Sequence, residues 1–216
     1  MEFETEEQQV EAIKKWWKEY GLTIAVGLFL GLGGIFGFRY FAEQREIKMA
    51  DTSGAYESVL AILKEQNDKE KFMAEASTFK IAHSDTIYSN LLSLQLAKLA
   101  VDVDDLGTAS QHLRDVVNNP QHGSIEHIAR IRLGRILLEQ DDTDKALALI
   151  ADAVGGEYQS SYELLRGDVW MAKGDRNRAR QAYEAAKSHS TDGPENPNLE
   201  MLLTDLTDET AVAEVE

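Results

Sequence analysis

The chain of 216 residues contains no cysteine. Disulfides, thiol catalysis and cysteine-ligated zinc sites are therefore excluded. Proline occurs only three times, and no run of Val, Ile and Thr alternates with polar residues, so the sequence offers no candidate strand. Alanine and leucine are plentiful instead, and together these features predict an all-α fold.

Basic residues are scarce beside acidic ones: 22 Lys and Arg against 38 Asp and Glu give a formal net charge of −16. Most of this charge lies after the first forty residues. Such a surface repels phosphate, so nucleic acid is not expected as a partner. It also disfavours flat binding to anionic lipid, and we expect the domain to stand off the bilayer.

Residue types that can carry out catalysis or bind metals are present, but not at the spacings that such sites require. None of the five histidines has the i, i+4 spacing of a helical metal pair, and no phosphate-cradling glycine loop is present. A calcium loop starting at Asp102 fails because Leu113 occupies the twelfth place, where a glutamate is required. The acidic run Asp141 to Asp144 is explained by helix capping through Thr143 or Asp144. We therefore predict a protein that is not an enzyme and has no cofactor or metal.

One long uncharged stretch stands out near the amino terminus. It runs from Gly21 to Phe38, and with Tyr40 and Phe41 it reaches the roughly 30 Å of a hydrocarbon core. The sequence thus predicts a transmembrane helix over 21–41, after a short segment 1–20. A cleaved signal peptide is the alternative, but the apolar part is too long and no small-x-small cleavage site follows it. Basic residues are balanced on the two flanks, so the positive-inside rule gives no orientation.

Glycines form two stripes along the predicted membrane helix. Without side chains they let another helix approach closely, either a partner's helix or that of a second copy in a homo-oligomer. Glycine is also simply common in membrane helices, so a purely structural role stays open. The glycines are Gly27, Gly31 and Gly34 in one stripe and Gly33 and Gly37 in the other.

Three later segments repeat one spacing of small and bulky residues. Within each segment the gaps are 12, 4 and 3 residues, as on two packed antiparallel helices whose small residues allow close approach. This is the tetratricopeptide pattern, and it predicts an α-α solenoid. The sets are Ala97, Ala109, Leu113 and Val116; Gly134, Ala146, Ile150 and Ala153; and Gly167, Ala179, Tyr183 and Ala186.

Stacked helix pairs of this kind curve and expose their first helices on the concave side. We predict a protein-binding groove on that side, apolar with scattered charge. Its leucines and isoleucines suit a core contact equally well, so both interpretations stay open. The groove residues are Leu91, Leu94, Lys98, Ile128, Ile131, Arg135, Leu164, Asp168 and Met171.

The repeats predict a tetratricopeptide-like domain over 42–206 with a cap at each end. Residues 50–66 and 70–83 are interpreted as a degenerate helix pair at its start. Pro194 and Pro197 break the chain before a last short helix. The acidic residues 207–216 are predicted to be a disordered tail.

The order of these features resembles the YfgM-like family, whose members are ancillary subunits of the bacterial Sec translocon. The likeness covers about residues 8 to 206, and it includes the segments QVEAIKKWWKEYG, GFRYF, AYESV, LRGDVWMAKGD and ARQAYEAAK. It implies a single-pass protein of the bacterial inner membrane, with a cytoplasmic amino terminus and periplasmic repeats. It also implies association with the SecYEG channel and with a membrane-anchored periplasmic chaperone of the prolyl-isomerase type.

Two functional hypotheses follow from this resemblance. In the first, the protein is an adaptor that assists the transfer of secreted proteins from the translocon into the periplasmic chaperone network. In the second, it is a membrane tether whose membrane helix and segment 1–20 sequester a stress-response regulator, because the family is also linked to a response regulator. The sequence leaves both open.

Overall fold

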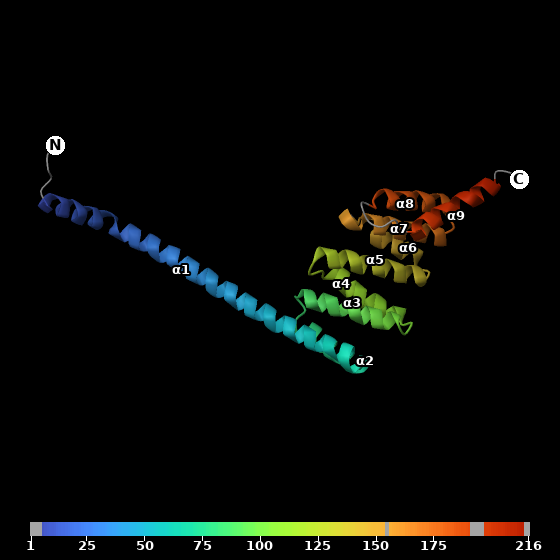
Figure 1. Ribbon diagram of the computed structural model, residues 1–216, viewed down its shortest axis with the longest axis horizontal. Coiled ribbons are helices and arrows are strands. Elements are labelled where there is room, and N and C mark those ends of the chain that lie inside the picture. Colours follow the sequence, from blue (N-terminus) through green and yellow to red (C-terminus); the bar gives the residue numbers. More distant parts are fainter. Residues whose placement is uncertain (1–5, 154–155, 191–196, 214–216) are drawn as a thin grey trace. The chain divides into compact units, whose positions relative to one another are not determined.

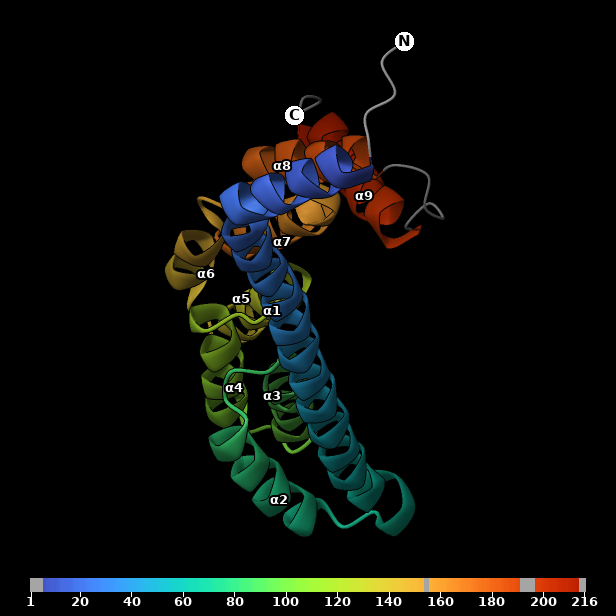
Figure 2. The same ribbon diagram turned by 90° about the vertical axis from the view of Figure 1, so that its left-hand side faces the viewer.

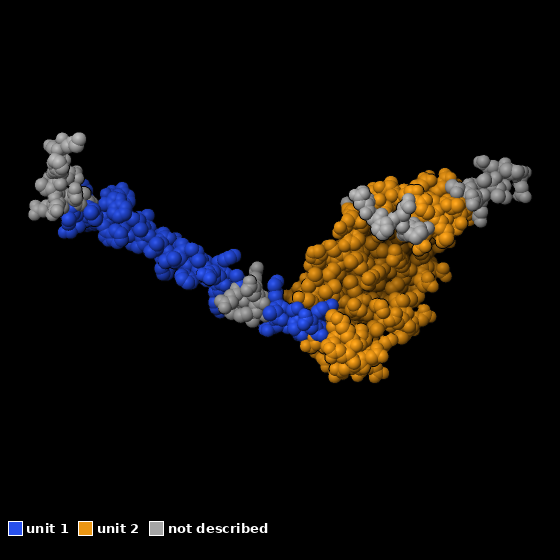
Figure 3. All heavy atoms as spheres, in the orientation of Figure 1, with its two compact units in different colours: residues 1–57 blue, residues 58–216 orange. Residues whose placement is uncertain are grey.

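The computed structural model describes residues 6–153, 156–190 and 197–213. All regular structure in these ranges is helical, which confirms the predicted all-α class. The chain divides into two compact units, residues 1–57 and residues 58–216, which are coloured separately in Figure 3.

The first unit consists of the long helix α1 (Glu6–Ala61), which runs on into the second unit at its end. Its segment Ile13–Tyr40 is long and apolar enough to cross a membrane, with a mean hydropathy of 2.0. The helix continues without a break through residues 42–50, beyond the predicted membrane segment 21–41. Within the described part of the chain, a β-carbon added at Gly27 or Gly31 would meet no side chain and no other segment within 4 Å.

The second unit is a succession of antiparallel helix pairs, visible from α2 to α9 in both ribbon views (Figures 1 and 2). The first and second helix of each pair pack together, α3 with α4, α5 with α6 and α7 with α8. The elements are a π-helical turn Ile62–Gln66, α2 (Lys69–Ala82), α3 (Ile87–Val101), α4 (Leu106–Asn118), α5 (Gly123–Glu139), α6 (Thr143–Ile150), a 3₁₀ turn Gly156–Tyr158, α7 (Gln159–Ala172), α8 (Arg176–Ser188) and α9 (Pro197–Ala213).

Small residues let the helices of this stack approach closely. Gly134 on α5 faces the side chain of Leu165 on α7, and Gly167 on α7 faces the ring of Tyr183 on α8. A β-carbon at either glycine would overlap the facing side chain. Of the twelve repeated positions, all are buried except Ala153, which is half-buried. The predicted tetratricopeptide-like packing is therefore confirmed.

The two helices of each pair are connected by the same type of turn, which the repeat spacing did not predict. The residue before the second helix's cap is left-handed in all three pairs, with φ of 62° at Asp104, 60° at Asp141 and 76° at Gly174. The amide of the following aspartate donates to a carbonyl five residues earlier, the bond that closes a Schellman motif. These bonds join Asp105 to Ala100, Asp142 to Leu137 and Asp175 to Trp170 at 2.8 to 2.9 Å.

Capping also differs from the expectation at one helix. Asp142 is the N-cap residue of α6, where the sequence favoured Thr143 or Asp144. Asp142 aligns with Asp105 and Asp175, whose carboxylates accept the amide of the third residue of α4 and α8. The repeat frame thus places Asp142 at the N-cap position, but its side chain makes no capping hydrogen bond and accepts one from Lys145 Nζ at 2.7 Å instead.

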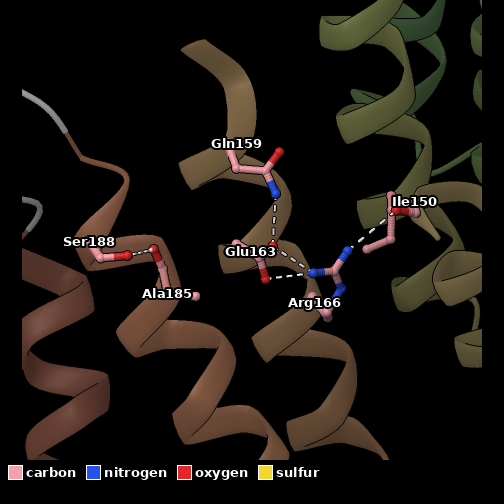
Figure 4. A network of polar contacts seen from close by, with 6 residues as sticks. All are labelled: Ile150, Gln159, Glu163, Arg166, Ala185 and Ser188. Atoms are coloured by element: carbon pink, nitrogen blue, oxygen red, sulfur yellow. Dashed lines mark hydrogen bonds and ion pairs between the residues drawn. The ribbon is translucent and has the colours of Figure 1, made fainter. Parts of the chain in front are cut away.

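Polar side chains tie α7 to the preceding pair (Figure 4). Arg166 donates from Nη1 to both carboxylate oxygens of the buried Glu163 at 2.6 Å, and from Nη2 to the carbonyl of Ile150 at 3.4 Å. Gln159 donates to the same carboxylate at 2.9 Å. Because Glu163 is buried, these hydrogen bonds offset the free-energy cost of removing its charge from water.

Helix α9 covers the last pair. Leu199 and Leu206 are buried with Tyr183 and Ala186 in one cluster. The helix extends to Ala213, so the backbone of residues 207–213 is helical in this structure where the sequence predicts a disordered tail. Residues 214–216 lie outside the described ranges.

Candidate protein-binding surface

The predicted groove residues fall on the first helices α3, α5 and α7, but they differ in exposure. Lys98 and Arg135 are exposed. Leu94 and Ile131 are buried in the main core, and Leu91 and Ile128 are half-buried against it. Leu164 and Met171 pack against the second cluster, and Asp168 accepts a hydrogen bond from the Tyr183 hydroxyl at 2.9 Å. Both interpretations left open by the sequence are therefore represented among these side chains.

A hollow of about 270 Å³ lies on this face between α3 and α5. Its apolar lining is Leu94, Ala97, Val101, Leu113 and Ile136. Its polar lining is entirely basic and consists of Lys98, Arg132 and Arg135. Three of the predicted groove residues, Leu94, Lys98 and Arg135, thus meet around one hollow. The sequence interpretation missed Arg132 and Ile136 because it counted only the positions usual for this repeat.

The three cations of the hollow are weakly neutralised within the chain. Lys98 pairs with the neighbouring Asp102 at 3.3 Å, where both side chains are well exposed. Such an exposed pair contributes little to stability. Among the residues that the structure describes, Arg132 and Arg135 form no ion pair within 4.0 Å. A positive patch therefore stands in a strongly acidic protein.

Asp168, close enough to Arg135 for their charges to interact, has a raised pKa. Burial raises the pKa of its carboxyl, and the hydrogen bond from Tyr183 and the charge of Arg135 offset part of that rise. Burial and the neighbouring Asp168 likewise raise the pKa of the Tyr183 hydroxyl. Tyr183 and Asp168 thus belong to the packing contact between α8 and α7, which ends in the hydrogen bond between the two side chains.

Side chains with catalytic potential gather at one further place. His127 on α5 lies with Nδ1 2.9 Å from the Tyr162 hydroxyl on α7, and its ring stacks on Tyr158. Tyr162 is completely buried and His127 is half-buried, and the contact joins the helix pair of α5 to that of α7. In the described ranges, no group of three or more His, Asp or Glu side chains is placed to hold a metal ion.

Three stacked helix pairs with small residues at their crossings, preceded by a helix able to span a membrane, define a tetratricopeptide-type repeat protein with an apolar amino-terminal helix. Residues 14–208 match the family model described as a tetratricopeptide repeat-like domain.

Curated relatives make the assignment more specific. The chain is similar to proteins named ancillary SecYEG translocon subunit from Haemophilus influenzae (31% identical over 182 residues, 84% of this chain and 88% of the relative) and Escherichia coli (30% over 183 residues, 85% and 87%). A third relative of the same name, from Aggregatibacter actinomycetemcomitans, is 29% identical over 185 residues, 86% of this chain and 90% of the relative. The chain therefore belongs to the family of the ancillary SecYEG translocon subunits, which confirms the resemblance found in the sequence.

Proposed function

We propose that this protein is a non-enzymatic adaptor of the bacterial inner membrane. It associates with the Sec translocon and with a membrane-anchored periplasmic chaperone, and it assists the transfer of secreted proteins into the periplasmic chaperone network. The family membership supports the translocon as a partner, since the relatives carry the translocon in their names.

The observation that carries the proposal is the hollow on the first helices. Its lining combines apolar side chains with three cations, and Arg132 and Arg135 are exposed to solvent. Apolar surface rimmed by polar groups is typical of a site that binds another protein. The repeat domain thus offers a surface for a partner polypeptide, and the apolar segment Ile13–Tyr40 offers a means of holding that surface at the membrane.

The proposed topology places residues 1–20 in the cytoplasm, residues 21–41 across the inner membrane and the repeats in the periplasm. Protease added to spheroplasts tests it directly. Digestion of the repeat domain from outside is the expected result, with a short amino-terminal fragment protected until detergent is added. Protection of the whole chain in intact spheroplasts contradicts the topology and with it every periplasmic partner.

Crosslinking in isolated membranes tests the partners. Photo-reactive residues in place of Lys98 or Arg135 should capture the channel, the chaperone or emerging secretory chains. The same residue in place of Arg114, exposed on α4 and outside the hollow, is the matched control.

Capture of a signalling protein alone opposes the adaptor and favours the membrane tether. Deletion of residues 1–15 makes the converse test, because a tether acting from the cytoplasm should lose its effect while an adaptor should keep it.

A further inference from the structure

The hollow lies at the junction of α3 and α5, and the internal repeat shows how the junction of α5 and α7 differs from it. At the junction of α5 and α7, Leu165 of α7 fills the space above Gly134. Leu165 is completely buried there. The equivalent space is therefore closed by the protein's own leucine.

The repeat spacing identifies the matching residues one junction earlier. Moving from the second repeat to the first takes Gly134 to Ala97, and moving from the third to the second takes Leu165 to Arg132. Ala97 and Arg132 both line the hollow between α3 and α5. Arg132 is exposed, so its side chain does not close the space above Ala97 as Leu165 closes the space above Gly134. At this junction the β-carbon of Ala97 fills part of the space that Leu165 takes beside Gly134, and the hollow lies next to it, where Arg132 stands in place of the leucine.

The size and charge of the hollow define what fits. A volume of about 270 Å³ lies below the range of sites that enclose a drug-sized molecule, and it suits one inserted side chain. The cations Lys98, Arg132 and Arg135 surround the opening. A carboxylate beside the inserted side chain would reach them, and guanidinium groups bind carboxylates in a paired geometry.

We propose that this hollow binds a segment of a partner polypeptide that inserts a leucine-sized apolar side chain above Ala97 and sets an aspartate or glutamate beside Arg132. The inserted side chain lies against Ala97 in the hollow, at the junction where the repeat has Arg132 in place of Leu165. The proposal rests on the function proposed above, because the occupant is a protein brought to the repeat domain, and it names the chemistry by which that protein is recognised.

Selection from a library of short random peptides, with the full-length chain held in lipid nanodiscs, tests this chemistry. Peptides that carry a leucine, methionine or phenylalanine next to an acidic residue should be enriched. Replacing that apolar residue by alanine should weaken binding about tenfold or more, in keeping with the free energy of burying one such side chain. Replacing the acidic residue by its amide should weaken binding and reduce its dependence on salt.

Arg132→Leu is the decisive variant, because it places an apolar side chain of the protein itself at the lining of the hollow and removes one of its charges. It should weaken binding of the selected peptides at least about tenfold while the melting temperature stays the same or rises. Arg132→Gln leaves the hollow open and should lose only the contribution of the charge. Arg114→Leu makes the same change outside the hollow and should leave binding unchanged.

The inference is overturned if no peptide is enriched, if the enriched peptides lack the apolar and acidic pair, or if Arg132→Leu binds them as well as the original chain does. Retention of a fatty acid in place of a peptide, detected by mass spectrometry of the intact chain, also overturns it. The proposed function is tested separately. Intact crosslinking to the translocon with no Arg132-dependent peptide binding defeats only this inference, whereas Arg132-dependent peptide binding without those crosslinks defeats only the proposed function.

Discussion

The ring of Tyr183 on α8 occupies the space that a β-carbon on Gly167 of α7 would need. The tyrosine hydroxyl donates to Asp168, the residue after that glycine, at 2.9 Å. The ring is therefore fixed by its packing against Gly167 and by the hydrogen bond of its hydroxyl group, and it has little freedom to move aside. This contact makes the glycine necessary for packing and not only for helix flexibility.

Gly167→Ala should lower the free energy of unfolding by about 1–3 kcal/mol, since overpacking a closed core displaces neighbouring groups. Thermal unfolding of the full chain in detergent, followed by circular dichroism, measures the change. Gly107→Ala is the control. A β-carbon there would meet only Asp105 Oδ1 at 3.5 Å, and alanine should stabilise the helix by ~0.5–1 kcal/mol. Equal stability of the Gly167 variant and the original chain would show that α7 and α8 are less closely packed than described.

This packing was predictable from the sequence, whereas the hollow was not. Small residues at a helix crossing are imposed by the geometry of two backbones, so the spacing that contains Gly134 and Gly167 recurs in every repeat. The hollow depends on a single side chain, Arg132, at a position that is core in the next repeat. Periodicity marks Leu94 and Ile131 as inward-facing, but it cannot separate a groove from a core because both are apolar.

The helix caps were likewise predictable only in part. Four acidic or hydroxyl residues, Asp141 to Asp144, stand in line where the chain enters α6, and each suits an N-cap. Only alignment with Asp175, which follows a glycine at the turn, selects Asp142. The residue before the cap has a left-handed backbone conformation. A glycine such as Gly174 indicates this conformation in the sequence, whereas an aspartate such as Asp141 does not.

The turn at Gly174 gives a second test. Its φ of 76° is a conformation that residues with side chains rarely adopt, and a β-carbon there would meet no atom within 4 Å. Gly174→Ala should therefore lower the free energy of unfolding by about 1–2 kcal/mol through backbone strain alone. Gly123→Ala is the matched control, because its β-carbon also enters open space and its φ is not positive. If both variants unfold at one temperature, the left-handed turn does not persist in solution.

Asp168 makes stability depend on pH in a defined direction. Burial raises the pKa of this carboxyl in the folded chain above its unfolded value. Protonation therefore favours the folded state, so the contribution is complete below the unfolded pKa and is lost as pH rises through the folded pKa. Asp168→Asn keeps an oxygen to accept from Tyr183 and removes the titration.

The difference in melting temperature, variant minus original, should accordingly be smallest near about pH 3 and should increase toward about pH 7. Melting curves of both proteins across this range provide the measurement. Ser161→Ala on the same helix removes no titrating group and should give a difference that does not change with pH. A difference for Asp168→Asn that falls as pH rises contradicts the assigned shift.

The membrane helix carries the last prediction. Gly27, Gly31 and Gly34 lie on one side of α1, and among the residues that the structure describes no side chain or other segment comes within 4 Å of a β-carbon built on them. If this stripe packs against another helix, Gly27→Leu together with Gly31→Leu should abolish association by preventing close approach. Energy transfer between labelled chains in liposomes measures self-association, and crosslinking in native membranes measures association with a foreign helix. Phe29→Leu, on the opposite side of α1, should change neither signal, and undiminished association of the double variant in both assays would assign the glycines to the helix alone.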